Sequence, residues 1–149
     1  MKKTALVLAA LAAFAAGPAL AADTPQEAAN KRAVLAFYDA ALNKLDFAAA
    51  SAYLGAGYKQ HNPTAADGPE GLKGFITFLK TTYPQTHSEI VRSFADRDYV
   101  ILHVHAVRTP GTAGNAIVDI FRLDKGKVVE HWDAVQPIPE KAANANGMF

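Results

Sequence analysis

The chain contains no cysteine among its 149 residues, and this absence removes several kinds of chemistry at once. Without a thiol there is no disulfide framework, no thiolate nucleophile and no cysteine-based zinc or iron–sulfur site. Export into an oxidising compartment is compatible with this composition but does not follow from it.

An excess of charge of either sign is also missing. Lys and Arg total 15 against 14 Asp and Glu, a net charge of +1, and without Lys2 and Lys3 of the N-terminal segment the net charge is −1. Such a balance creates no long-range field toward nucleic acid or an anionic membrane. We therefore expect the partner to be a small molecule or another protein.

The motifs of several enzyme classes are absent as well. The sequence has no Gly-x-Ser-x-Gly elbow, no Gly-rich phosphate loop and no His-Glu-x-x-His pair. The short 55–57 Gly-Ala-Gly segment lacks the third glycine and the preceding strand of a dinucleotide site. We expect a pocket that works without a cofactor and without a metal.

The N-terminus has the layout of a secretory signal. A basic pair precedes an apolar run (5–16), and a Gly-Pro break and the small residues 19–21 follow it. The run is shorter than the roughly 20 residues that span a bilayer, so we predict a cleavable signal over residues 1–21. Residues 22–149 are then a single secreted or periplasmic domain with no membrane association after cleavage. An uncleaved N-terminal anchor is the alternative.

The first part of the mature chain has the periodicity of helices. Residues 24–27, Thr-Pro-Gln-Glu, combine a capping residue, a helix-starting proline and a capping-box glutamate, which predicts a helix start. Asp46 predicts a short second helix through Leu54, ended by the following glycines, and the 68–70 Gly-Pro-Glu segment opens a third that ends before Pro84. The first helix carries an apolar stripe: Val34, Phe37, Tyr38, Ala41, Leu42 and Leu45.

From Ser88 onward the period of the apolar residues changes to two. Short Asp- and Gly-containing connectors imply that successive strands pair antiparallel. Helices followed by strands are typical of the α+β class, so we expect three N-terminal helices packed on a strongly curved antiparallel sheet. The predicted strands are a brief one at 58–60 and four longer ones at 88–95, 99–108, 116–124 and 127–135.

The register of the last hairpin decides which side chains meet. A three-residue loop ending at Gly126 sets Asp119 opposite His131, with Asp133 diagonal to Asp119 on the same face. A two-residue turn would instead put the two aspartates on opposite faces. The first register is favoured because the remaining residues of that face are apolar: Ile117, Phe121, Leu123, Val129 and Val135.

Asp119, His131 and Asp133 are therefore our candidate catalytic residues. Three ionisable groups on one apolar face form either a satisfied buried network or a working site, and we favour the working site. Desolvation among apolar side chains raises the pKa of an aspartate toward the range that a general acid or base needs, and Asp133 is the residue that we expect to move the proton.

Four further residues are candidate substrate contacts. We expect His61 or Asn62 to hydrogen-bond a carbonyl or enolate oxygen, and Phe37 and Phe121 to line the apolar part of the cavity.

His103 and His105 share one face of a predicted strand. A position at solvent or at a dimer interface is the favoured interpretation, ahead of a polar role in the pocket. A cupin-like metal site completed by His131 or His61 is the remaining alternative.

The opposite face of the sheet is predicted to carry much apolar surface. Such a face exceeds what an isolated chain usually exposes, so we expect a homodimer. The alternative is that residues 137–149 fold back over it. The face is made of Val118, Ile120, Val128, Glu130 and Trp132.

Three segments, 58–63, 68–71 and above all 121–133, resemble the SnoaL-like polyketide cyclase family of the nuclear transport factor two-like superfamily, over essentially the whole mature chain. The resemblance implies a cone of three helices and a bent sheet around an apolar cavity, often in dimers. It also implies that Asp133 is the acid/base aspartate of an intramolecular aldol closure, that Asn62 is a pocket asparagine, and that Asp119 stands where the family has a histidine.

The expected function is a cofactor-independent lyase, isomerase or cyclase for a small apolar carbonyl compound, with Asp119 and His131 tuning Asp133. The alternatives are a non-catalytic periplasmic small-ligand-binding protein of the same fold and a metal-dependent enzyme.

Overall fold

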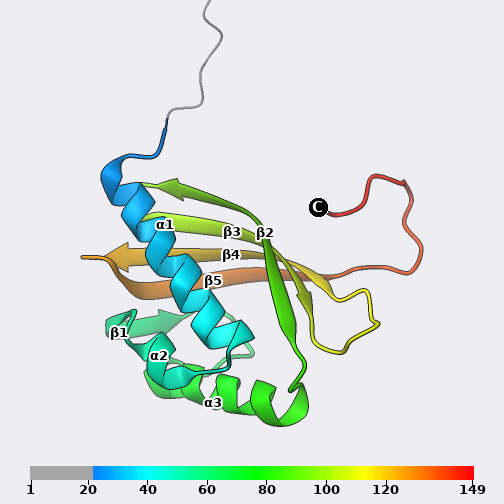
Figure 1. Cartoon of the computed structure of the whole chain (residues 1–149), viewed down its shortest axis with the longest axis horizontal. Coiled ribbons are helices and arrows are strands. Elements are labelled where there is room, and N and C mark those ends of the chain that lie inside the picture. Colours follow the sequence, from blue (N-terminus) through cyan, green and yellow to red (C-terminus); the bar gives the residue numbers. More distant parts are fainter. Residues whose placement is uncertain (1–21) are drawn as a thin grey trace, which may run out of the picture.

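The computed structural model describes residues 22–149, in which helices precede most of the strands (Figure 1). The helical elements are α1 (Pro25–Tyr38), the π-helical segment η1 (Asp39–Asn43), α2 (Phe47–Ser51) and α3 (Gly68–Thr82). The strands are β1 (Leu54–Gln60), β2 (His87–Asp96), β3 (Tyr99–Val107), β4 (Asn115–Asp124) and β5 (Lys127–Pro137). The expected signal segment lies outside the described residues. No helix in the described part is long and apolar enough to cross a membrane.

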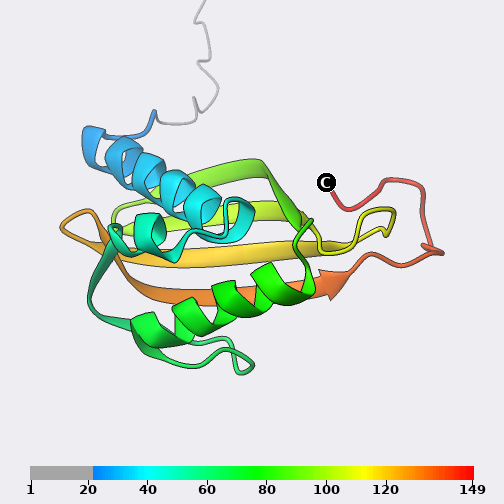
Figure 2. The ribbon, with the colours of Figure 1, turned by 60° about the horizontal axis from the view of Figure 1, so that its bottom comes forward.

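The strands form one five-stranded sheet in the order β1-β5-β4-β3-β2. The four strands from β2 to β5 are antiparallel, as predicted, whereas β1 pairs in parallel with β5. The sheet is therefore mixed. All three helices lie on one side of it (Figure 2), with α1 against β2, β3 and β5 and α3 against β1. We call this side the inner face and the opposite side the outer face.

The predicted helix starts are confirmed. Thr24 caps α1, and its hydroxyl and the Glu27 carboxylate form both hydrogen bonds of a capping box. The Asp46 carboxylate accepts a hydrogen bond from the Ala49 N–H at the start of α2. The predicted end of α2 is wrong, because the helix ends at Ser51 and the two glycines that follow lie in β1.

The core lies between the helices and the inner face. Phe75 of α3 is only half-buried because it lines a cavity. The fully buried side chains come from α1, α3 and the sheet, and the largest are Tyr38, Leu79, Leu102, Val34, Val100, Val104 and Val128.

The predicted register of the last hairpin is wrong in its details. Lys125 and Gly126 form a two-residue turn in which both have positive φ, 49° and 75°, a conformation that suits glycine, and Asp124 pairs with Lys127. This is the turn that would separate the two aspartates if the strands were regular. Instead, Asp119 lies directly opposite Asp133.

The two aspartates share a face because β5 contains one extra residue. Val128 pairs with Leu123 and Glu130 pairs with Arg122, so Val129 has no partner on β4 and forms a bulge. Val128 is consequently the buried residue, whereas Val129 was predicted to be buried and Val128 to lie on the outer face.

The outer face carries His103 and His105. His103 pairs with Val118, which is exposed and alternates with the buried Asp119, so both histidines point away from His131. His61 does not bring its ligand atoms together with theirs either, so within residues 22–149 the cupin-like alternative does not fit. The Phe149 ring lies 5.1 and 4.9 Å from the two imidazoles, so the C-terminal segment folds back over this part of the face.

Candidate active site

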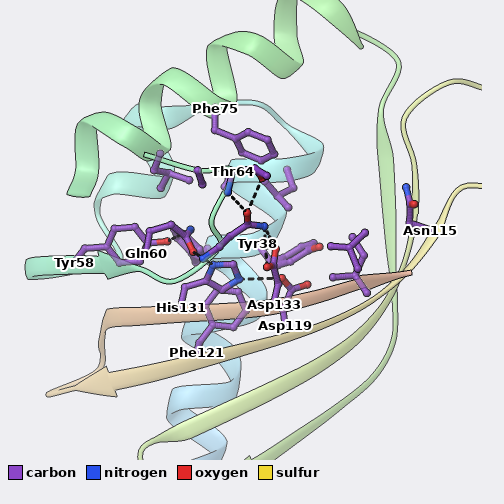
Figure 3. A pocket seen from close by; sticks show the side chains of 18 of the residues that line it. Tyr38, Tyr58, Gln60, Thr64, Phe75, Asn115, Asp119, Phe121, His131 and Asp133 are labelled. Atoms are coloured by element: carbon purple, nitrogen blue, oxygen red, sulfur yellow. Dashed lines mark hydrogen bonds and ion pairs between the residues drawn. The ribbon is translucent and has the colours of Figure 1, made fainter. Parts of the chain in front are cut away.

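A cavity of about 230 Å³ opens between α1, α3 and the inner face (Figure 3). It is smaller than the roughly 300–1,000 Å³ of drug-sized ligand pockets, so only a small molecule fits inside it. Most of its wall is apolar, which favours a largely apolar ligand. The wall includes two predicted contacts, Phe37 and Phe121, together with Leu72, Phe75, Ile117 and Val135.

Asp119, His131 and Asp133 come together in this cavity, as the sequence predicted. Asp119 is 4% exposed and His131 is 9% exposed, and His131 Nε2 lies 2.9 Å from Asp119 Oδ1. The Phe121 ring stacks on the imidazole at 4.7 Å. The sheet thus holds a hydrogen-bonded carboxyl–imidazole pair under an aromatic cover beside the half-buried Asp133.

The other nitrogen of His131 shows where its protons are. Nδ1 lies 2.9 Å from Gln60 Oε1, and the same oxygen accepts a hydrogen bond from the backbone N–H of Asn62. Because an amide oxygen only accepts, Nδ1 carries a proton. The bond between Nε2 and Asp119 then contains one proton, so the pair is an imidazolium with a carboxylate or a neutral imidazole with a carboxylic acid.

Asn62 orients Asp133. Its Nδ2 donates to both carboxylate oxygens of Asp133, at 2.8 and 2.7 Å, while its Oδ1 accepts from the N–H and hydroxyl of Thr64. In the described part of the chain no other side chain bonds Asp133. Asn62 therefore holds the carboxylate in place, and its amide oxygen is occupied by Thr64.

Tyr38 presents a buried phenol to the same cavity. The side chain is 1% exposed, and within residues 22–149 its hydroxyl has no hydrogen-bond partner, as is also true of Ser88 Oγ and Asp119 Oδ2. Burial, and then the charge of Asp119, raise the pKa of Tyr38 well above its usual value. The phenol stays protonated, and its polar neighbours are Ser88 Oγ and Asp119 Oδ2, which lie just beyond hydrogen-bond distance.

Tyr58 is a second buried phenol with a raised pKa, on the β1 side of the cavity. Burial, followed by the charges of Asp119 and Asp133, raises the pKa of its phenol, and its oxygen accepts a hydrogen bond from Gln60 Nε2.

His61, a predicted substrate contact, lies on the outer face instead. Its ring stacks on Trp132 at 4.5 Å, and Nε2 lies 2.9 Å from Glu130 Oε1. Glu130 also pairs with Arg122, and these two partners lower the pKa of its carboxyl. The physical reason is strand alternation: Gln60 points inward, so the next residue points outward.

Several polar residues of the cavity were not predicted from the sequence, among them Tyr38, Gln60 and Arg108. Tyr38 was treated as part of an apolar helix stripe, although a buried phenol needs a partner for its hydroxyl. Gln60 lay inside the motif but was not singled out. Arg108 ended a predicted strand, and its guanidinium lines the cavity while donating to Thr86 Oγ1 at 3.1 Å.

The cluster also has the composition of a metal site. Asp119, His131 and Asp133 each offer one ligand atom, and these atoms lie within 4.8 Å of one another. Two carboxylates and an imidazole suit a divalent cation. Such an ion would have to replace the proton between His131 Nε2 and Asp119 Oδ1.

Comparisons with known proteins agree with the fold. The profile of the SnoaL-like domain matches residues 34–131, and no curated protein matches the chain. TsrD from Streptomyces laurentii is 19% identical over 72% of this chain and 88% of its own, with a TM-score of 0.61. A proposed SnoaL-like polyketide cyclase from Jannaschia is 18% identical, with coverages of 77% and 90% and a TM-score of 0.64. A proposed ketosteroid isomerase from Kribbella flavida is 14% identical, with coverages of 80% and 86% and a TM-score of 0.65.

Proposed function

The chain belongs to the SnoaL-like domain family, and from this premise we propose that it is a cofactor-independent lyase, isomerase or cyclase for a small, largely apolar carbonyl compound. Asp133 is the general acid and base. The observation that carries the proposal is the position of its carboxylate: it lines an apolar cavity, is held by Asn62 and lies beside the Asp119–His131 pair.

The reaction begins when Asp133 takes a proton from the carbon next to the carbonyl. The C–H electron pair moves into the carbon–carbon bond and the carbonyl electrons move to oxygen, which gives an enolate and a protonated Asp133. Asp133 then returns the proton. It goes to another carbon in an isomerisation, to a departing oxygen in an elimination, or to the new alkoxide after the enolate carbon attacks a second carbonyl.

Tyr38 is the donor for the enolate oxygen. Its hydroxyl is buried and protonated beside Ser88 Oγ and Asp119 Oδ2, and a turn of the ring toward the cavity brings it to a developing anion. When His131 is the charged partner, its imidazolium favours the same negative charge. This assignment replaces the expected roles of His61 and Asn62, because one lies on the outer face and the other is bonded to Asp133.

The names of two structural neighbours support this type of chemistry. One is a proposed polyketide cyclase and the other a proposed ketosteroid isomerase. Their low identity to the chain limits their support to the fold, so the reaction itself rests on the cavity.

Deuterium exchange into cyclopentanone, followed by proton NMR, tests the proposal without knowledge of the substrate. We expect the protein to accelerate exchange next to the carbonyl, and Asp133→Asn to lower that rate by about 100-fold or more. Asp124→Asn, an exposed carboxylate at the hairpin turn, is the matched control and should keep the full rate. Full exchange activity in Asp133→Asn rejects the role of Asp133.

A non-catalytic binding protein is the second candidate. The hydrogen bonds that join Asp119, His131 and Gln60 favour it, because a closed network of this kind also occurs as a structural element. In that case the wild-type protein binds a ligand and accelerates no exchange.

Elemental analysis of protein purified without chelators tests the metal-dependent alternative.

A further inference from the structure

One end of the cavity is positively charged. The Arg108 side chain, which follows β3, is half-buried and lines the cavity next to Phe75. Its guanidinium lies 5.8 Å from the centre of the Phe75 ring and donates to Thr86.

This guanidinium has no anion in direct contact within residues 22–149, and Asp119 acts on it only at longer range, where its charge opposes the lowering of the Arg108 pKa by burial. No carboxylate of residues 22–149 lies within ion-pair distance of Arg108. A guanidinium has five N–H donors, and its hydrogen bond to Thr86 uses one of them. Burial lowers the pKa of Arg108, which expresses the cost of holding the charge away from water.

The cavity is consequently dipolar. The Asp119–His131 pair contains one shared proton and is neutral as a whole, which leaves Asp133 as the negative charge and Arg108 as the positive one. These two charges are not paired with each other. A ligand that suits both ends needs an anionic group at Arg108 and an acidic C–H bond at Asp133.

We propose that the ligand of this cavity is a small carbonyl compound that carries a carboxylate, and that Arg108 binds this carboxylate. The guanidinium fork fits a carboxylate bidentately, and Arg108 lines the cavity in which that carboxylate would lie. The carbonyl part of this assignment rests on the proposed function, whereas the recognition of the anion rests on Arg108 alone.

Benzoate and benzamide are suitable probes because they have nearly the same shape and differ in charge. Isothermal titration calorimetry on the mature protein should show benzoate binding at least about tenfold more tightly than benzamide, the scale of a charge-assisted hydrogen bond. Equal binding of the two probes, or no binding of benzoate at millimolar concentration, overturns the proposal even without a variant.

Substitutions then assign the preference to a residue. Arg108→Met keeps a long apolar stem beside Phe75 and should abolish the preference for benzoate, while Arg108→Lys should keep part of it. Arg92→Met removes an exposed arginine of β2 and is the matched control, with the preference intact. A preference that survives Arg108→Met in a folded protein, as judged by its thermal unfolding, contradicts the role of Arg108.

The proposal and the proposed function fail separately. Asp133→Asn should still prefer benzoate, because the charge that binds the carboxylate is unchanged. An Arg108-dependent preference without proton exchange leaves anion recognition standing and rejects catalysis. Exchange activity without any preference for benzoate supports the proposed catalysis and rejects the recognition of an anion by Arg108.

Discussion

The hydroxyl is the only polar group of the buried Tyr38 side chain, and we expect its removal to raise stability and lower activity. A buried hydroxyl without a partner costs roughly 1–3 kcal/mol, so Tyr38→Phe should unfold at the same or a higher temperature than the wild type. Loss of one donor to a developing oxyanion should lower the exchange rate by about 10²–10³-fold. Calorimetric unfolding and NMR exchange measure the two effects. A less stable but fully active Tyr38→Phe assigns the hydroxyl a structural role.

Glu27 makes stability depend on pH at one surface position. Hydrogen bonds from the backbone N–H of Arg97 and of Thr24 lower the pKa of its carboxyl to about 2 from 4.5. Since the folded pKa is the lower one, the ionised form favours folding, and this contribution is complete above pH 4.5 and lost as the pH falls toward 2. The stability difference between the wild type and Glu27→Gln should therefore shrink over that range. A difference that is constant with pH in thermal unfolding contradicts this.

For single residues, the alternation of side chains between the two faces of a strand predicts which of them meet only where the strand is regular. It places Asp119, His131 and Asp133 on one face, and it would have placed Gln60 inward and His61 outward had the length of β1 been known. Patterns do not show which side chains lack a partner, because that depends on contacts between distant elements. Tyr38 and Arg108 were missed for this reason.

Helix α3 contains two glycines that differ in the space available for a side chain. A Cβ at Gly74 meets nothing within 4 Å, whereas a Cβ at Gly71 lies 1.9 Å from the Ala66 carbonyl oxygen. Gly74→Ala should stabilise the protein by about 0.5–1 kcal/mol through helix propensity. Gly71→Ala should destabilise it by about 1–3 kcal/mol, because the loop that carries Asn62 has to move. Urea unfolding measures both, and a shift of the same sign in the two variants contradicts the prediction.

The elements themselves were largely predictable, but their pairing was not. Capping residues and changes of period located the three helices and the four long strands, because these signals are local. The parallel pairing of β1 with β5 joins segments far apart in the chain, and nothing local to β1 indicates it. The bulge at Val129 likewise depends on β1, since Val129 packs where a side chain on Gly55 would lie.

For the whole molecule, the outer face still favours the dimer that we expected from the sequence. One apolar row, Phe94, Ile101, Ile120 and Trp132, crosses it through four paired strands, and Phe94 is 55% exposed. The C-terminal segment covers the region of His103 and His105 instead.

We propose that two copies of the chain pair through this row about a two-fold axis. Light scattering should give twice the mass of one chain, and Trp132→Glu should reduce it to one while benzoate binding persists. A wild-type mass of one chain at micromolar concentration rejects the dimer.

Export through a cleaved signal at residues 1–21 stays a prediction. Mass spectrometry of the secreted protein checks it by showing whether these residues have been removed.

The bulge in β5 also governs where the chain tolerates a change of length. Val129 is one residue more than a regular hairpin needs, so a deletion at this position leaves Glu130 opposite Arg122 and keeps His131 and Asp133 inward. A deletion of Ile120 instead moves Asp119 into an outward position and removes it from the cavity. Alignments of relatives should therefore place single-residue gaps at 129 and none between Asp119 and Arg122. The two deletion variants should differ in the same way, with exchange activity retained in the first and lost in the second.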